Sequence, residues 1–208
     1  MTILALEFSS EQRSVALARG GFVVAEAGEI GGRDTKAFGL IEKVLADANI
    51  GREQVEVIVV GLGPGSYTGI RATIAVAQGW QLARSIKLLG ESSVTALAAQ
   101  AQAAGIFGRV NVVVDAQRGE FYRGTWDISA AVRQEFAPLQ IVTAAEMVAL
   151  KGTGEICVGP EADIILWPRA AMLAQLAAGR TDFVAGETLA PIYLRETSFV
   201  KAPPARVI

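Results

Sequence analysis

Hydrophobic and polar residues alternate along the first hundred residues in patterns that change from strand-like to helix-like. Three short apolar runs, separated by polar or glycine turns, predict an antiparallel meander of three strands. Apolar residues then recur at helical spacing after Phe38, and a continuous apolar run at 57–60 is typical of a strand covered on both faces. The expected elements of this half are strands at 3–8, 14–18 and 22–26, a helix at 38–48, a strand at 57–60, a helix at 68–84, a strand at 86–89 and a helix at 92–103.

A similar pattern begins again at residue 110. An apolar strand ends in Asp115, a short polar turn follows, and residues 120–127 return as a second strand. Glu7 ends the first strand of the chain in the same way, which indicates an internal duplication. Two such halves predict an α/β protein with the two-lobed actin-like/Hsp70-like ATPase (ASKHA) fold, a duplicated mixed sheet flanked by helices.

The second half of the chain carries weaker signals. Thr143 and Glu146 have the spacing of a capping box at the start of a helix. Pro168 suits the first turn of another helix, which Gly179 is expected to end. These two helices are the clearest elements that the sequence predicts beyond residue 128.

We expect the chain to divide into two lobes of unequal content. The N-terminal lobe, residues 1–106, contains a glycine loop and the helices next to it. The C-terminal lobe, residues 107–208, is reduced. Residues 190–195 have an extended pattern, and residues 201–208, with two consecutive prolines, are expected to form a loose tail.

Composition excludes several classes of function. The 208 residues are 51% hydrophobic and carry a net charge of -2, so a core can form but autonomous tRNA binding through a basic face is not supported. The chain has no histidine, which excludes Ser-His-Asp triads, Cys-His pairs and histidine-based zinc sites. Its one cysteine, Cys157, lies among apolar residues and is expected to be a buried structural thiol. No apolar run reaches the roughly 18 residues that a membrane helix needs.

A glycine-rich loop at 61–71, Gly-Leu-Gly-Pro-Gly-Ser-Tyr-Thr-Gly-Ile-Arg, joins a strand to the long helix. Glycines allow close backbone approach, and a helix N-terminus attracts anions. The residues that could lie next to an anion or nucleotide are Gly63, Gly65, Ser66, Thr68 and Arg71. The loop nevertheless lacks the Walker A and Rossmann patterns, and it also fits a tight connection in which Ser66 or Thr68 caps the helix.

Arg71 is a cation in the first turn of the long helix. There it opposes the helix dipole by roughly 0.3–1 kcal/mol. We expect this cost to be offset by a carboxylate of the chain, a bound anion or an acidic group of a partner. An internal ion pair is the commonest of these arrangements.

Small residues form a stripe along the long helix, which is apolar nearly all round. Such a stripe permits close approach of another helix, and the spacing suits a nearly parallel crossing. The stripe could pack on the chain's own sheet, on the helix at 38–48 or on another chain. Our hypothesis is a two-helix platform for a partner, formed by Phe38, Ile41, Leu45, Gly69, Ala72, Val76, Gly79 and Ala83.

Three segments carry a resemblance to a known family. Gly63-Pro-Gly-Ser-Tyr-Thr-Gly-Ile-Arg71 closely matches the signature of the TsaB (YeaZ) family. Asp115-Ala-Gln-Arg-Gly-Glu-Phe-Tyr122 and Pro191-Ile-Tyr-Leu-Arg195 resemble two further segments of that family. The resemblance runs from residue 3 to about 195, clear in the first half and sparse between 128 and 188.

The resemblance implies a cytoplasmic bacterial protein of tRNA processing, which takes part in the synthesis of threonylcarbamoyladenosine at adenosine 37 of tRNA. It implies a catalytically inert subunit, without a cofactor of its own, that binds and organises TsaD, the paralogue that holds the metal and transfers the threonylcarbamoyl group. TsaE, an ATPase, joins that complex. The family also self-associates through the same helices, so a homodimer is expected when the chain is alone, and tRNA is contacted only through the complex.

Two departures from the family pattern bear on catalysis. The family usually begins with an Asp-Thr-Ser segment, where this chain has Glu7-Phe8-Ser9, and the metal-binding histidine pair of TsaD is absent. The alternative is an ATPase or kinase of the same fold, with Glu7 and Asp115 holding magnesium. The interpretation that we favour for these two acids is a pair of solvated strand ends. A peptidase lacks every histidine-dependent device here.

Overall fold

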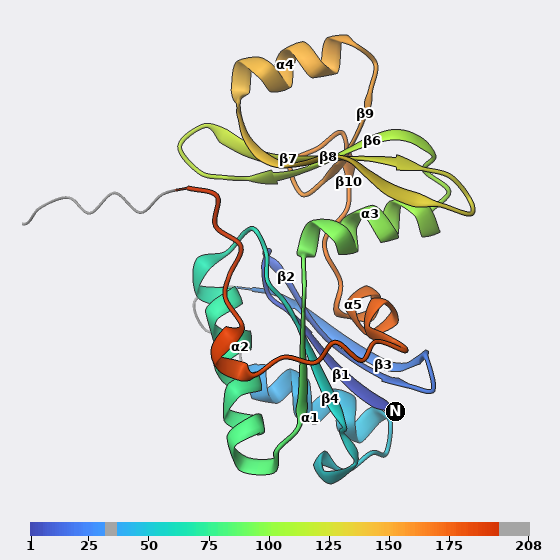
Figure 1. The fold of residues 1–208 in the computed structure, drawn as a ribbon, viewed down its shortest axis with the longest axis vertical. Helices are drawn as coiled ribbons and strands as arrows, with labels where there is room; N and C mark the ends of the chain where they lie inside the picture. The colour runs from blue at the N-terminus through green and yellow to red at the C-terminus, as the bar shows by residue number, and fades with distance from the viewer. Residues whose placement is uncertain (32–36, 196–208) are drawn as a thin grey trace, which may run out of the picture.

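The computed structural model describes residues 1–31 and 37–195, so the predicted loose tail at 201–208 lies outside the described residues. Two five-stranded sheets form two lobes, one above the other, with helices against them (Figure 1). The prediction of a duplicated, two-lobed mixed-sheet fold is confirmed. None of the described helices is long and apolar enough to span a membrane.

The first sheet has the strand order β3-β2-β1-β4-β5. Its strands are β1 (Thr2–Glu7), β2 (Gln12–Arg19), β3 (Phe22–Ile30), β4 (Val57–Gly61) and β5 (Lys87–Glu91). β1, β2 and β3 pair antiparallel, as the meander predicts, whereas β4 and β5 run parallel to β1. The parallel strands are reached through helices because a parallel connection must cross over the sheet.

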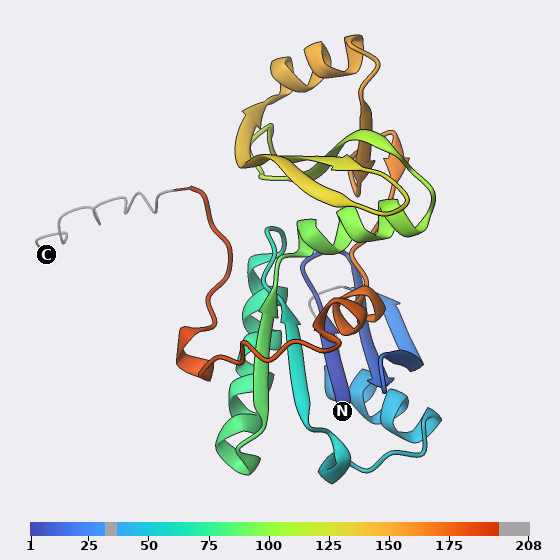
Figure 2. The same cartoon turned by 45° about the vertical axis from the view of Figure 1, so that its right-hand side comes forward.

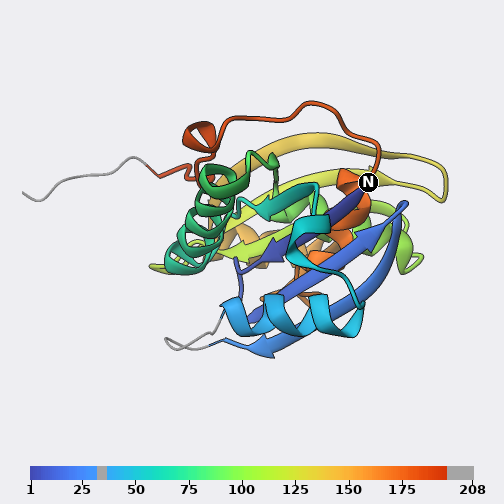
Figure 3. The ribbon, with the colours of Figure 1, turned by 90° about the horizontal axis from the view of Figure 1, so that it is seen from below.

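Helices cover both faces of the first sheet. On one face, Leu4 and Leu6 of β1 pack in a core with α1 (Ala37–Asp47) and α2 (Tyr67–Arg84). On the other face, alternate residues such as Ile3 pack against α5 (Ala170–Ala177). The view from below shows α1 and α2 against the sheet (Figure 3). Burial on both sides explains why β1 and β4 are continuous apolar runs in the sequence.

The second sheet repeats the plan of the first. Its strands are β6 (Gly108–Asp115), β7 (Glu120–Ile128), β8 (Arg133–Thr143), β9 (Ile156–Gly159) and β10 (Ile164–Ile165). The order is β10-β9-β6-β7-β8, with β6, β7 and β8 antiparallel and with β9 and β10 parallel to β6. Read from β8, this is the order of the first sheet, so Glu7 and Asp115 do end equivalent strands.

The remaining helices join or cover the lobes. α3 (Ser93–Ala103) lies between the two sheets and contributes side chains to a core on each side (Figure 2). α4 (Ala144–Gly152) covers part of the far face of the second sheet. Its predicted capping box is confirmed, because the Thr143 hydroxyl accepts from Glu146 N while the Glu146 carboxylate accepts from Thr143 N. Two short 3-10 helices, η1 (Arg52–Gln54) and η2 (Gly186–Thr188), complete the elements.

After the second sheet, the chain returns to the first. The helix expected from Pro168 begins at Ala170 and packs on the first sheet as α5. Further on, Val184 N donates to Leu88 O at the free edge of β5. The lobe predicted at 107–208 therefore includes a segment that packs on the first sheet, a long-range pairing that local sequence patterns do not report.

Candidate functional site

The glycine loop between β4 and α2 lies directly on the end of β1. A Cβ atom on Gly65 would overlap the carbonyl oxygen of Ser9, and one on Gly69 would overlap that of Phe8. Ser66 N also donates to Ser9 O at 2.7 Å. Close packing on β1 therefore requires glycine at both positions, independently of any ligand.

The polar groups of this loop are largely paired inside the chain. Gly63 N donates to the Ser93 hydroxyl at 3.2 Å, and Gly63 O accepts from Ser93 N at 2.9 Å. The Ser66 hydroxyl accepts from Gly69 N, so Ser66 is the N-cap of α2, and Thr68 lies exposed in the first turn. The backbone N–H groups of Gly63, Ser66 and Gly69 are therefore engaged within the chain and are not free to bind a phosphate.

Glu7, the first of the two candidate magnesium ligands, is fully buried. Its carboxylate accepts hydrogen bonds from Ser9 N and from the Ser93 hydroxyl, each at 2.8 Å. Gly61 makes room for it, because a Cβ atom there would overlap the carboxylate. Burial raises the pKa of Glu7 above its usual value, although the hydrogen bonds from Ser9 and Ser93 act in the opposite direction. The expectation that Glu7 is a solvated strand end is therefore wrong, and this geometry is that of a structural carboxyl group.

Asp115, the second candidate, lies in a cleft of about 520 Å³ between the lobes. Its carboxylate accepts from the backbone and side-chain amides of Gln117 at 2.7 and 2.6 Å, which holds the turn after β6. Glu11 and Glu161 line the same cleft. Burial raises the pKa of Glu161, and the charges of Asp115 and Glu11 add to this effect. Arg13 is the basic residue among those that line the cleft, so its three acids, Glu11, Asp115 and Glu161, outnumber the one cation and disfavour a phosphate group.

The residues present do not fit a magnesium site. Among residues 1–31 and 37–195, no group of three or more acidic or cysteine side chains could hold a metal ion. Glu7 is enclosed, and Asp115 is engaged by its own turn.

The prediction that Cys157 is a buried thiol is confirmed, and burial raises its pKa.

One side of α2 is uncovered by the rest of the described chain. Ala72, Gly79 and Ala83 of the predicted stripe are exposed, and a Cβ atom on Gly79 would meet nothing within 4 Å. Leu82 lies among them with 90% of its surface exposed. We call this surface the α2 face; it comprises Thr68, Arg71, Ala72, Ala75, Gly79, Leu82 and Ala83.

The other residues of the predicted platform lie elsewhere. Ile41 and Leu45 of α1 are buried in the core of the first lobe, 1% and 5% exposed, and Gly69 is buried against β1. Val76 is half-buried against the same core, whereas Phe38 is 62% exposed at the start of α1. The predicted stripe therefore includes residues from both the buried and the exposed sides of α2. The spacing of small residues does not show which side of a helix faces the sheet.

Two tyrosines extend the α2 face beyond what the sequence predicts. The ring of Tyr67, the first residue of α2, stacks on that of Tyr193, with centroids 5.5 Å apart and planes 22° apart. The Arg71 guanidinium lies 5.3 Å from the Tyr67 ring centroid. In the described part of the chain, Arg71 therefore contacts a ring and not the carboxylate of the expected internal ion pair. Tyr67 and Tyr193 each lie in a segment that resembles the TsaB family, and this resemblance is the feature of the sequence that singles them out.

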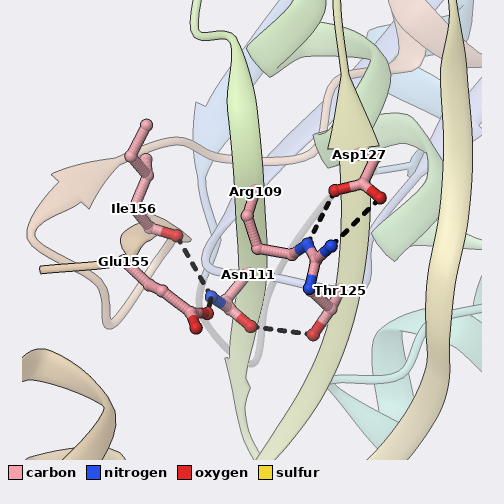
Figure 4. Close-up of polar contacts among 6 residues, drawn as sticks. All are labelled: Arg109, Asn111, Thr125, Asp127, Glu155 and Ile156. Carbon is pink, nitrogen blue, oxygen red and sulfur yellow. Dashed lines mark hydrogen bonds and ion pairs between the residues drawn. The ribbon is translucent and has the colours of Figure 1, made fainter. Parts of the chain in front are cut away.

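A polar network lies in the second lobe, at positions for which we made no prediction from the sequence. Asn111, in the middle of β6, is 1% exposed; its amide accepts from the Thr125 hydroxyl and donates to Glu155, each at 2.8 Å (Figure 4). Next to it, Arg109 forms a bidentate ion pair with Asp127. An asparagine within an apolar strand was the signal for such a network, because a buried amide needs hydrogen-bond partners.

A duplicated sheet of this order, with a cleft between two lobes, defines a protein of the actin-like ASKHA class. Its α2 face is exposed, and the acid that ends its first strand is enclosed. The model of the family TsaD, tRNA N6-adenosine threonylcarbamoyltransferase, matches residues 8–184. The chain belongs to this family and, within it, to the TsaB (YeaZ) branch.

Relatives of the TsaB branch support this placement. The chain is 27% identical to tRNA threonylcarbamoyladenosine biosynthesis protein TsaB of Escherichia coli over 231 residues, covering 99% of this chain and 100% of that protein. It is 29% identical to TsaB of Bacillus subtilis, but covers only 66% of that relative and 72% of itself. The solved structure of YeaZ from Pseudomonas aeruginosa superposes with a TM-score of 0.78 at 25% identity, over 93% of this chain and 99% of that chain.

Proposed function

We propose that this protein is a non-catalytic subunit in the synthesis of threonylcarbamoyladenosine at adenosine 37 of tRNA. In this role it binds and organises a TsaD-type paralogue through the α2 face. The observation that carries the proposal is that face: Leu82, 90% exposed, stands beside the small exposed residues Ala72, Gly79 and Ala83.

The α2 face has the shape that a helix of another subunit needs. Small side chains let two helix axes approach closely, and Leu82 provides a side chain that a partner's groove can bury. A large apolar side chain left almost wholly in water, surrounded by more apolar surface, is typical of a protein–protein contact. Phe38, exposed on α1 on the same side of the sheet, extends this contact.

The absence of catalysis by this subunit is supported by the end of β1 and by the glycine loop. A nucleotide-hydrolysing protein of this fold needs acids and loop amides directed at phosphates. Here Glu7 accepts from Ser9 and Ser93 inside the core, and Gly63 N is paired with Ser93. The chemistry of the system is therefore assigned to the paralogue.

The other partners follow from the same assignment. A TsaE-type ATPase joins the complex, and tRNA is contacted through the assembled complex, consistent with the net charge of -2 on this chain. Alone, the chain forms a homodimer that uses the α2 face. The proposed reaction places the protein in the cytoplasm, where tRNA is modified.

The experiment is co-purification of the tagged full chain with the TsaD-type paralogue of the same organism, together with an assay of threonylcarbamoyladenosine in tRNA. We expect the wild type to retain the paralogue and to support modification. Gly79→Leu should weaken retention at least tenfold, because it places a large side chain where two helices meet, while the thermal unfolding midpoint stays within a few degrees.

The matched control is Gly152→Leu. Gly152 is also an exposed glycine of a helix whose added Cβ would meet nothing within 4 Å, but it lies in α4 of the second lobe. It should leave retention of the paralogue unchanged. Equal retention by the wild type and Gly79→Leu would contradict the proposal.

A second measurement addresses the ATPase alternative. The isolated chain should show no micromolar affinity for ATP by titration calorimetry in the presence of magnesium. Tight binding, with hydrolysis that Asp115→Asn abolishes, would instead favour an ATPase or kinase.

A further inference from the structure

The last described segment, residues 184–195, runs along the side of the molecule and is called here the strap. It leaves the edge of β5, passes α2 and rises to the level of the second lobe, as Figures 1 and 2 both show. Gly186 is held by two side chains of α2, donating to Gln81 Oε1 at 2.7 Å and accepting from Gln78 Nε2 at 2.8 Å. Ile192 N donates to Leu62 O at 2.8 Å. The strap is therefore fixed to the first lobe at several points.

The end of the strap is fixed to the second lobe. The Arg195 guanidinium donates to the carbonyl oxygen of Ala116 at 3.1 Å and forms an ion pair with Glu120. Ala116 lies in the turn that follows β6, and Glu120 is the first residue of β7. The Arg195 and Glu120 side chains are 29% and 38% exposed, so the contact is partly shielded from water. Arg195 thus connects the strap, which is attached to the first lobe, with the second lobe.

Two covalent connections join the lobes, and neither runs through the strap. One leads from α3 to β6, and the other from β10 to α5. The connection from β10 to α5 is tied to α3 through Gln100, whose side chain donates to Trp167 O at 2.8 Å and accepts from Arg169 N at 3.0 Å. The figures show this junction on the α5 side and the strap on the α2 side. A rotation of the lobes about the junction would therefore pull on the strap.

The middle of the strap contacts the start of the α2 face. Tyr193 stacks on Tyr67, which in turn lies under the Arg71 guanidinium. The strap is attached to the first lobe at Ile192 and to the second lobe at Arg195. Tyr193 lies between these two attachments, where its ring stacks on Tyr67. A displacement of Arg195 consequently changes the position of Tyr193 against α2.

We propose that the strap is a latch, which holds the two lobes at a fixed angle through Arg195 and Glu120 and links that angle to the α2 face through the Tyr193–Tyr67 stack. The second part of this statement rests on the proposed function of the α2 face. An exposed or partly exposed ion pair shifts an equilibrium by up to about fivefold, and that is the scale of the expected effect.

The test measures the distance between the lobes in the full chain without the paralogue, with the doubly labelled chain diluted in an excess of unlabelled chain so that only distances within one subunit are measured. Spin labels are placed on Ala46→Cys in α1 and Val148→Cys in α4, two exposed positions, in a Cys157→Ala background. We expect Arg195→Glu or Glu120→Arg to broaden and lengthen the distance distribution, and the combined charge exchange to restore it. Unchanged distributions in both single variants would overturn the latch.

The control breaks an ion pair of similar chemistry within one lobe. Arg109→Ala removes the pair with Asp127 on neighbouring strands and should leave the distance between the lobes unchanged. A variant that merely loosens the fold would show a lower unfolding midpoint. The charge exchange distinguishes that case, because only a direct contact is restored by exchanging its two ends.

A second readout separates the latch from the proposed function. Affinity for the TsaD-type paralogue should fall by about two- to fivefold in each single variant and recover in the charge exchange. Unchanged affinity together with altered distances would overturn the link to the α2 face. Failure of the wild type to bind the paralogue would contradict the proposed function alone, because the distances are measured without a partner.

Discussion

The two lobes carry different residues at equivalent positions of their sheets, which share one strand order. Counting back four residues from the acids that end β1 and β6 gives Ile3 in the first lobe and Asn111 in the second. Ile3 is fully buried in an apolar cluster beneath α5. Asn111 is as deeply buried, but it is held by Thr125 and Glu155.

The difference shows how a lobe can lose helices and keep its sheet. The first sheet is covered on both faces, by α1 and α2 on one side and by α5 on the other. On the far face of the second sheet, α4 covers only a small cluster that includes Val113 and Cys157. Hydrogen-bonded polar side chains occupy the rest of that face, with Asn111 and Thr125 themselves buried and paired with each other. The large helical surface that a partner could use remains on the first lobe.

The largest effect is expected from Ile3→Ala. Removing this side chain leaves a cavity under α5 and should lower the free energy of unfolding by about 2–5 kcal/mol. Urea denaturation followed by circular dichroism measures it. A loss below about 1 kcal/mol would mean that α5 does not cover the first sheet as tightly as the apolar cluster indicates.

Asn111→Ala should cost less, about 1–3 kcal/mol, because it leaves the buried Thr125 hydroxyl without its partner. The same denaturation experiment applies. Arg109→Ala, which breaks the more exposed pair with Asp127 on the same face, is the control and should cost under about 1 kcal/mol. If Arg109→Ala cost more than Asn111→Ala, the buried network would not be what stabilises this lobe.

Two glycines of α2 test which side of the first lobe is left open. Gly79→Ala should stabilise the isolated chain by about 0.8–1 kcal/mol, because the added methyl meets nothing and alanine favours the helix. Gly69→Ala should destabilise it, because the methyl overlaps the carbonyl oxygen of Phe8. Thermal unfolding of both variants shows whether each one is stabilised or destabilised. A change in the same direction in both would refute the assignment of Gly79 to the exposed side and Gly69 to the buried side of α2.

The smallest change in the free energy of unfolding is expected from Glu7→Gln at about pH 4. This change should become larger as the pH rises. The pKa of Glu7 is raised from its usual 4.5 in the folded chain. Above that pH the unfolded carboxyl ionises first, so Glu7 makes the free energy of unfolding fall as the pH rises. Glutamine removes this contribution, so the variant should gain stability relative to the wild type as the pH rises above about 4.5. A difference independent of pH would contradict the burial of an ionisable group at this position.

Local patterns in the sequence predicted the elements of the first lobe and the duplication, and they failed where distant segments pair. The capping box of α4 and the N-cap at Ser66 depend on residues three apart, so the sequence shows them. The strands β8, β9 and β10 were not predicted, since short strands in irregular sequence carry little periodicity.

The candidate site divides in the same way. The stripe of α2 was visible as spacing, and Ala72 and Gly79 do lie on its exposed side. Spacing could not show that Ile41 would be buried in the core, because both sides of α1 near it carry apolar residues. The stack of Tyr67 on Tyr193 joins residues more than a hundred positions apart, which no local pattern can anticipate.

The return of the chain to the first sheet has a consequence for how the protein is completed on the ribosome. The second sheet is contiguous in sequence, from Gly108 to Ile165, whereas the first lacks its cover until α5 has been made. The lobe that is begun first is therefore finished last. Until then, nascent chains expose the apolar face that Ile3 occupies, and chaperones that recognise such surfaces have a defined interval in which to act.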